Sequence, residues 1–87
     1  MGATTFTCEL HGIPAETLRR YLARLGTEPL PTGDLTGPGW TARLIPLPDY
    51  RLGQATFCSF RVELQGEDEV LRQVWPRFEL LTQRPGG

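Results

Sequence analysis

The only histidine of the chain, His11, is the first residue whose type and position could support chemistry. It follows Glu9 at a spacing of two, and a histidine beside a carboxylate can act as a general base. Residues two apart share one face of a strand, so Glu9 is within reach, whereas Cys8 lies on the opposite face. Because no nucleophile lies near it, we expect His11 to be an exposed residue at a strand end, and we predict no enzymatic activity.

The two cysteines, Cys8 and Cys58, are the other candidates for a nucleophile or a redox pair. Each lies between large apolar residues of an alternating pattern, where a thiol behaves as a small apolar side chain with a raised pKa. We expect both to be buried and inert, and to be neighbours across a sheet. One histidine and two core cysteines are too few for a metal site of three or four ligands. The sequence therefore predicts neither a metal nor a cofactor.

The sequence closes with Arg84-Pro85-Gly86-Gly87, and a diglycine is thin enough to enter the active site of an adenylating enzyme. Small sulfur-carrier proteins use such a tail. Ubiquitin-like carriers begin with a strand hairpin before their main helix and place a strand before the tail. Here a helix is predicted directly after the first strand, and a second helix is predicted before the tail. Activation at Gly86 and Gly87, as in a sulfur-carrier-like or ubiquitin-like protein, is thus the alternative function.

The composition excludes several classes of protein. The formal charge of the 87 residues is −1, so no strong positive field attracts nucleic acid or an anionic membrane. No apolar run approaches the roughly 20 residues of a membrane span, and no secretory signal precedes the first strand. We expect a cytoplasmic protein with reduced thiols. The absence of Lys and Asn and the eight prolines suggest a heat-adapted host with a GC-rich genome.

Two stretches alternate between apolar and polar residues and predict strands that bury one face. The longer runs from Gln54 to Gln65, and the sheet is built around it; the other runs from Thr4 to His11. A third strand is predicted at Trp40–Leu47, followed by a turn through Pro46, Pro48 and Gly53 with a brief pairing at Tyr50–Leu52. The segment between Thr27 and Gly39, with three Gly and three Pro, permits one short edge strand at most.

Two further stretches have helical periodicity. The first begins at Pro14 and ends at Gly26, with apolar residues at i, i+3, i+4 and i+7 from Leu18. The second follows Gly66, which is expected to end the long strand. Pro76 interrupts its apolar stripe and is expected to kink or divide the helix. Residues 82–87 are expected to form a flexible tail.

The order of these elements gives a single α+β domain over residues 1–87, with both helices on one face of a curved antiparallel sheet. It resembles a small uncharacterised domain of heat-loving bacteria, the C-terminal domain of proteins related to the molybdopterin synthase small subunit. The features that carry the resemblance are Thr5–Leu10, Pro14–Leu25, the strands from Trp40 to Gln65 and the Trp75-Pro76 helix. It implies a TBP-like fold, β-α-β(2-4)-α; the alternative is a ferredoxin-like sandwich, which needs a further strand after the second helix.

The primary functional prediction is a non-enzymatic binding or interaction domain. The apolar residues Ile45, Leu47 and Phe57 fall on the sheet face opposite the helices, so a homodimer through that face is predicted; an unknown protein partner is the alternative. If the domain takes a small molecule, the cleft between the sheet and the second helix is the expected site. The residues predicted to line that cleft are Trp40, Phe60, Trp75 and Phe78.

Overall fold

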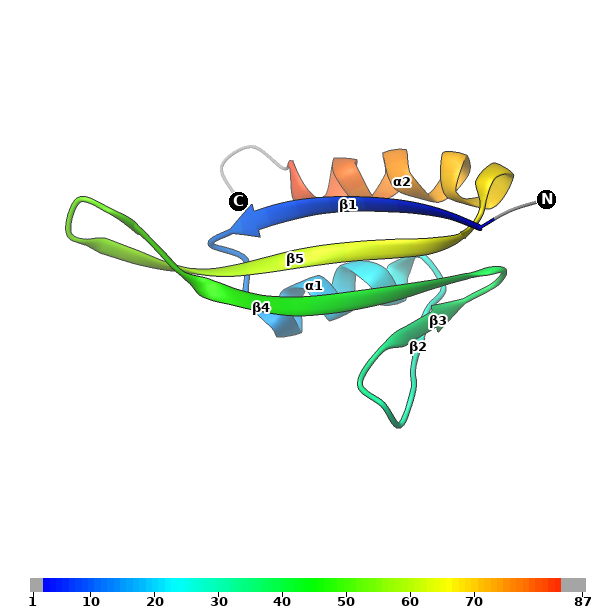
Figure 1. Cartoon of the computed structure of the whole chain (residues 1–87), viewed down its shortest axis with the longest axis horizontal. Coiled ribbons are helices and arrows are strands. Elements are labelled where there is room, and N and C mark those ends of the chain that lie inside the picture. The colour runs from blue at the N-terminus through cyan, green and yellow to red at the C-terminus, as the bar shows by residue number, and fades with distance from the viewer. Residues whose placement is uncertain (1–2, 84–87) are drawn as a thin grey trace.

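The computed structural model describes residues 3–83, and within them one antiparallel sheet carries two helices (Figure 1). In chain order the elements are β1 (Ala3–His11), α1 (Ala15–Arg24), β2 (Glu28–Pro29), β3 (Leu35–Gly37), β4 (Trp40–Leu52), β5 (Ala55–Glu67) and α2 (Asp68–Thr82). The sheet order is β1-β5-β4-β3-β2. The predicted α+β class is therefore confirmed, and the long strand β5 lies inside the sheet between β1 and β4.

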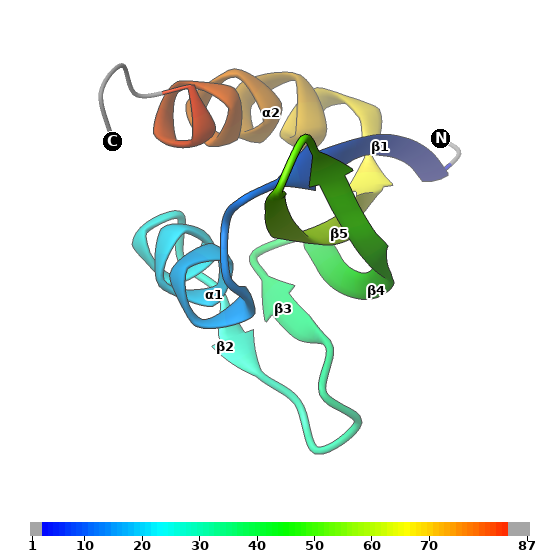
Figure 2. The same ribbon diagram turned by 90° about the vertical axis from the view of Figure 1, so that its left-hand side faces the viewer.

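The two helices lie on the same side of the curved sheet, as predicted (Figure 2). The even-numbered side chains of β5, Val62 and Leu64, point to this side and are completely buried. They form one core with Leu18 and Leu22 of α1 and with side chains of α2. The remaining fully or nearly buried members of this core are Leu35, Trp40, Ala42, Leu71 and Phe78. The apolar side chains that alternate along the strands thus pack against those that recur every 3.6 residues along the helices, and together they form a single apolar layer.

The course of β4 differs from the prediction. The strand does not turn at Pro46 and Pro48; it continues to Leu52, with an irregular register between Leu47 and Tyr50. β3 pairs with β4 only as far as Ala42, so the other edge of β4 beyond that residue has no partner strand within residues 3–83. Proline is tolerated on such an edge because the missing N–H breaks no ladder on that side. The predicted pairing at Tyr50–Leu52 is confirmed.

The paired ends of β4 and β5 project beyond both helices as a hairpin, residues 47–58, which we call the arm (Figure 1). On the other side of β4, the segment rich in Gly and Pro forms two short strands, β2 and β3, where the sequence predicts one at most. Pro29 lies in β2, the outermost strand of the sheet, in agreement with the expectation that proline confines this segment to an edge.

The prediction that Gly66 ends β5 is wrong, and of the two outcomes expected at Pro76, a kink or a division of α2, the division does not occur. Gly66 does not end β5; it lies inside the strand opposite Trp40, and a Cβ there would stand 2.5 Å from the carbonyl oxygen of Gly39. Glycine is therefore required for close approach of the two backbones. Pro76 does not divide α2, which is continuous to Thr82. Because Arg72 and Pro76 are both exposed, the carbonyl group freed at Arg72 faces solvent.

Candidate functional site

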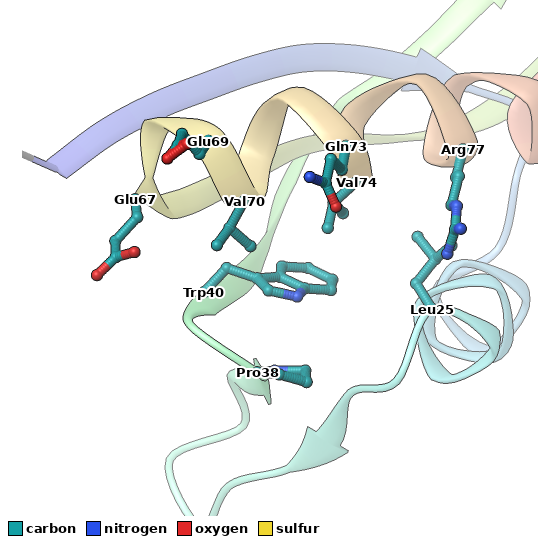
Figure 3. Close-up of a pocket in the computed structure, with 9 residues that line it drawn as sticks. All are labelled: Leu25, Pro38, Trp40, Glu67, Glu69, Val70, Gln73, Val74 and Arg77. Carbon is teal, nitrogen blue, oxygen red and sulfur yellow. The ribbon is translucent and has the colours of Figure 1, made fainter.

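One hollow on the helix side lies between α2 and the turn that leads into β4 (Figure 3). Its volume is about 440 Å³. From α2 and its start come Glu67, Glu69, Val70, Gln73, Val74 and Arg77; from the opposite wall come Leu25, Pro38 and Trp40. The cleft therefore brings together the end of α1, the β3–β4 turn and one side of α2, which are far apart in the sequence.

Trp40 forms the floor of this cleft, with only 3% of its surface exposed. Two glycines hold it there. A Cβ on Gly37 would stand 2.6 Å from the indole ring, and a Cβ on Gly66 would stand 2.8 Å from the Cα atom of Trp40. Glycine at both positions lets the indole lie flat between the turn and α2, which gives the cleft a rigid aromatic base.

A second hollow, of about 550 Å³, continues along α2 toward its C-terminal end. It is lined by Arg24, Leu25, Arg77, Leu80 and Leu81. Leu25 and Arg77 line both hollows, so the two are adjacent, and we call them together the α1–α2 groove. Leu80 is 72% exposed, more than any other large apolar side chain of the described residues.

The two ends of the α1–α2 groove carry side chains of opposite charge. Glu67 and Glu69 line the end next to Trp40, whereas Arg24 and Arg77 line the end next to Leu80. Within residues 3–83, neither arginine takes part in an ion pair. The pairs found there are Arg43 with Asp34, Arg61 with Glu9, and Arg72 with Asp68. Both guanidinium groups are consequently available to a ligand or a partner.

Of the four residues predicted to line a ligand cleft, only Trp40 lines the α1–α2 groove. Phe78 is completely buried in the core. Trp75 is half-buried and meets the ring of Phe6 edge-on, with the ring centroids 5.3 Å apart. Phe60 packs against the core from β5. The groove thus lies on the α1 side of α2. Most of the aromatic side chains predicted to line a cleft instead pack in the core.

His11 makes contacts that its position in the sequence did not reveal. Its Nδ1 atom lies 2.7 Å from the Oγ atom of Ser59, and its ring stacks on Tyr50 at a centroid distance of 4.4 Å. Glu9, its predicted partner, is instead hydrogen-bonded by Arg61 at 3.3 Å. Because Ser59 is only 3% exposed, this arrangement fixes the base of the arm and leaves no open serine for nucleophilic attack.

The two cysteines are free and half-buried, and they are not neighbours. Cys8 lies opposite Val62, whereas Cys58 is four residues earlier in β5. This separation corresponds to roughly 13 Å along a strand, too far for a disulfide, so the predicted proximity is wrong. Burial raises the pKa of the Cys8 thiol, and the negative charge of Glu79 raises it further. A raised pKa disfavours the thiolate, which is the reactive form of a cysteine.

Other predicted features concern metals, membranes and the tail. Among residues 3–83, no three His, Cys, Asp or Glu side chains gather in a way that would hold a metal ion. Neither α1 nor α2 has the length and the apolar character needed to cross a membrane. Gly86 and Gly87 lie outside the described residues. Thr82, predicted as the start of a flexible tail, is the last residue of α2, and its hydroxyl donates a hydrogen bond to the carbonyl of Glu79.

Sequence reasoning did not find the groove residues Arg24, Arg77 and Leu80. One signal was available for Leu80, because it falls outside the apolar stripe that defines the buried side of α2. An unburied leucine on a helix is common and is not informative alone. The exposure of Leu80 becomes informative because two arginines lie near it, one of them from α1. Only the packing of α1 on α2 brings these residues together.

Comparison with known proteins gives one family. A family model described as "Archaeal MoaD-like protein" matches residues 6–87, which is almost the whole chain. No curated protein matches the chain. The match is consistent with the predicted resemblance to a MoaD-like small domain, although the family is described as archaeal and the resemblance was to a domain of bacteria. The match extends through the diglycine, Gly86 and Gly87.

Proposed function

Because the chain belongs to the archaeal MoaD-like protein family, we propose that it is a carrier whose C-terminal glycine is activated by an ATP-dependent enzyme. The observation that carries the proposal is the extent of the match, which includes Gly86 and Gly87. The sequence analysis gave this function as the alternative to a binding domain. The family match favours it over the primary prediction.

The proposed chemistry takes place at the carboxylate of Gly87. A carboxylate oxygen attacks the α-phosphorus of ATP, the bond to the β-phosphate breaks, and pyrophosphate leaves. The product is an acyl adenylate on the glycine. A sulfide-level sulfur nucleophile then attacks the carbonyl carbon and releases AMP, which leaves a thiocarboxylate. A glycine suits this role because it has no side chain to obstruct entry into the enzyme.

The described structure supports a short attachment between the folded domain and the reactive end. α2 ends at Thr82, so residues 83–87 connect the domain to the carboxylate. Five residues of polypeptide reach at most about 17 Å. An enzyme that holds Gly87 must therefore touch the domain near the end of α2. The order of elements differs from that of ubiquitin-like carriers, since α1 follows β1 directly and α2 precedes the tail; we assign it to the TBP-like fold.

The test begins with mass spectrometry, under native and then denaturing conditions, of the protein purified from its own host. We expect part of the protein to carry a covalent change at Gly87, either an adenylate or the replacement of one oxygen by sulfur. The same protein should support exchange between ATP and radiolabelled pyrophosphate in a fraction of the host extract.

Deletion of Gly86 and Gly87 provides the decisive variant. We expect it to fold normally, because α2 ends before the tail, and to lose all exchange activity. Gln54→Ala serves as the control, since it shortens an exposed side chain in the turn of the arm and leaves the tail intact. If the truncated protein retained exchange, or if Gly87 were not the last residue of the natural protein, the carrier function would be wrong.

A second candidate is the binding domain that pairs with itself through the open sheet face. The observation that favours it is the exposure of Tyr50, Leu52 and Phe57 on the arm, by 42%, 63% and 37%. Exposed apolar clusters of this kind commonly mark contact surfaces. Sedimentation at high protein concentration tests it: a dimer that Phe57→Asp dissociates supports this candidate, and a monomer at every concentration rules it out.

A further inference from the structure

We propose that the Leu80 end of the α1–α2 groove is the docking site for an acidic, apolar segment of the enzyme that activates Gly87. This inference rests on the carrier function proposed above and adds the surface by which the enzyme recognises the protein. The surface consists of Arg24, Leu25, Arg77, Leu80 and Leu81.

The position of the groove is the first step. Leu80 and Leu81 belong to the last turn of α2, which leads into the five residues that connect the domain to Gly87. Because those residues span at most about 17 Å, the enzyme surface around its active site must face this part of the domain. A depression of about 550 Å³ at that place can accept several side chains of the enzyme.

The second step is the apolar character of the surface. Leu80 is 72% exposed, whereas Leu71 and Phe78 on the buried side of α2 are completely covered. Leu81 and Leu25 are partly buried beside it and extend the apolar area into the hollow. Burial of a leucine side chain against a partner releases free energy, because apolar surface leaves water. This energy is unused in the free domain and is available to a partner.

The third step is charge. Arg24 from α1 and Arg77 from α2 line the hollow, and neither forms an ion pair within residues 3–83. Complementarity therefore requires carboxylates on the partner beside its apolar residues. The carboxylates of Glu67 and Glu69 at the Trp40 end favour a basic group there, so the groove also selects the direction in which the segment lies.

The experiment uses the full-length protein and the activating enzyme, purified from the host by its ATP–pyrophosphate exchange with the wild-type chain. Two variants remove the proposed contacts, Leu80→Asp and Arg77→Glu. Their matched controls are Leu30→Asp between β2 and β3 and Arg51→Glu on the arm, which make the same chemical changes at exposed residues outside the groove. Circular dichroism and thermal unfolding verify that all four proteins are folded.

We expect the two groove variants to raise KM for the carrier about tenfold or more, with kcat little changed, whereas the two control variants behave as wild type. A lower kcat at unchanged KM, or equal effects of groove and control variants, would overturn the docking site and leave the carrier function standing. If the wild-type chain supports no exchange in any fraction, the carrier function itself fails, and the docking site fails with it.

Discussion

The two faces of the sheet use the same alternating strands in different ways. On the helix-covered face, Val62 and Leu64 are completely buried and form one core with both helices. On the open face, Ser59 is buried by its neighbours and the cluster with His11 and Tyr50 is held by one hydrogen bond and one ring stack. The first face stabilises the fold through buried area, whereas the second stabilises the arm through a few specific contacts.

The residues that stabilise the fold differ from the exposed residues that are candidates for binding. The fully buried side chains lie on the covered face, where a substitution disturbs the whole domain. The most exposed large apolar side chains are Leu80 at the α1–α2 groove and Leu52 on the arm. These can be changed with little effect on folding, so their roles in binding can be measured independently of stability.

The largest expected effect comes from a pair of phenylalanine truncations. Phe78→Ala removes a completely buried ring and should lower the free energy of unfolding by about 3–5 kcal/mol. Phe57→Ala removes a ring that is 37% exposed on the arm and should cost about 1 kcal/mol or less. Urea denaturation of both proteins measures the difference. Equal losses would mean that the arm contributes to folding as much as the core does.

Gly66→Ala should have the next largest effect, a loss of about 1–3 kcal/mol. Its added Cβ would meet the backbone of Gly39 and Trp40 at 2.5 and 2.8 Å, and neither can move as a flexible side chain would. The indole should shift, so tryptophan fluorescence should change together with the thermal midpoint. An unchanged midpoint would show that β5 and the β3–β4 turn are not held as closely as described.

Ser59→Ala tests the open face and should cost about 1 kcal/mol. The variant removes the hydrogen bond to His11 while keeping a small buried side chain. Thr41→Ala is a suitable control, since its hydroxyl is exposed and donates only a long bond of 3.5 Å to Gln65. Near-ultraviolet circular dichroism should detect any loss of order at Tyr50. Identical losses in the two variants would contradict a specific role for Ser59.

The smallest effect concerns Cys8 and alkaline pH. Burial and the charge of Glu79 raise the pKa of its thiol, so the folded protein holds that proton more tightly than the unfolded chain does. The resulting stability is present below the thiol pKa of the unfolded chain and is lost as pH rises toward the higher folded value. Cys8→Ala should remove this part of the pH dependence in urea denaturation, and Glu79→Gln should reduce it. Equal slopes in all three proteins would contradict it.

The sequence by itself determined the helices and strands whose apolar residues recur with a regular period. Alternation placed Val62 and Leu64 on the buried face of the central strand, and the spacing of Leu18 and Leu22 placed α1 on it. These predictions succeed because each depends on neighbours within a few residues. The diglycine was likewise identified without the tertiary structure, because it is visible in the sequence and lies within the family match.

Only the tertiary structure decided the features that join distant segments. The register of β1 on β5 brings His11 to Ser59 rather than leaving it with Glu9. In the part of the chain that the structure describes, one edge of β4 has no partner strand beyond Ala42, so the strand can pass Pro46 and Pro48; no local rule could indicate this without the sheet order. The packing of α1 beside α2 places Arg24 next to Arg77 and Leu80. Local periodicity fixes which face a residue takes, whereas its partner on that face depends on the register and packing of segments far apart in the chain.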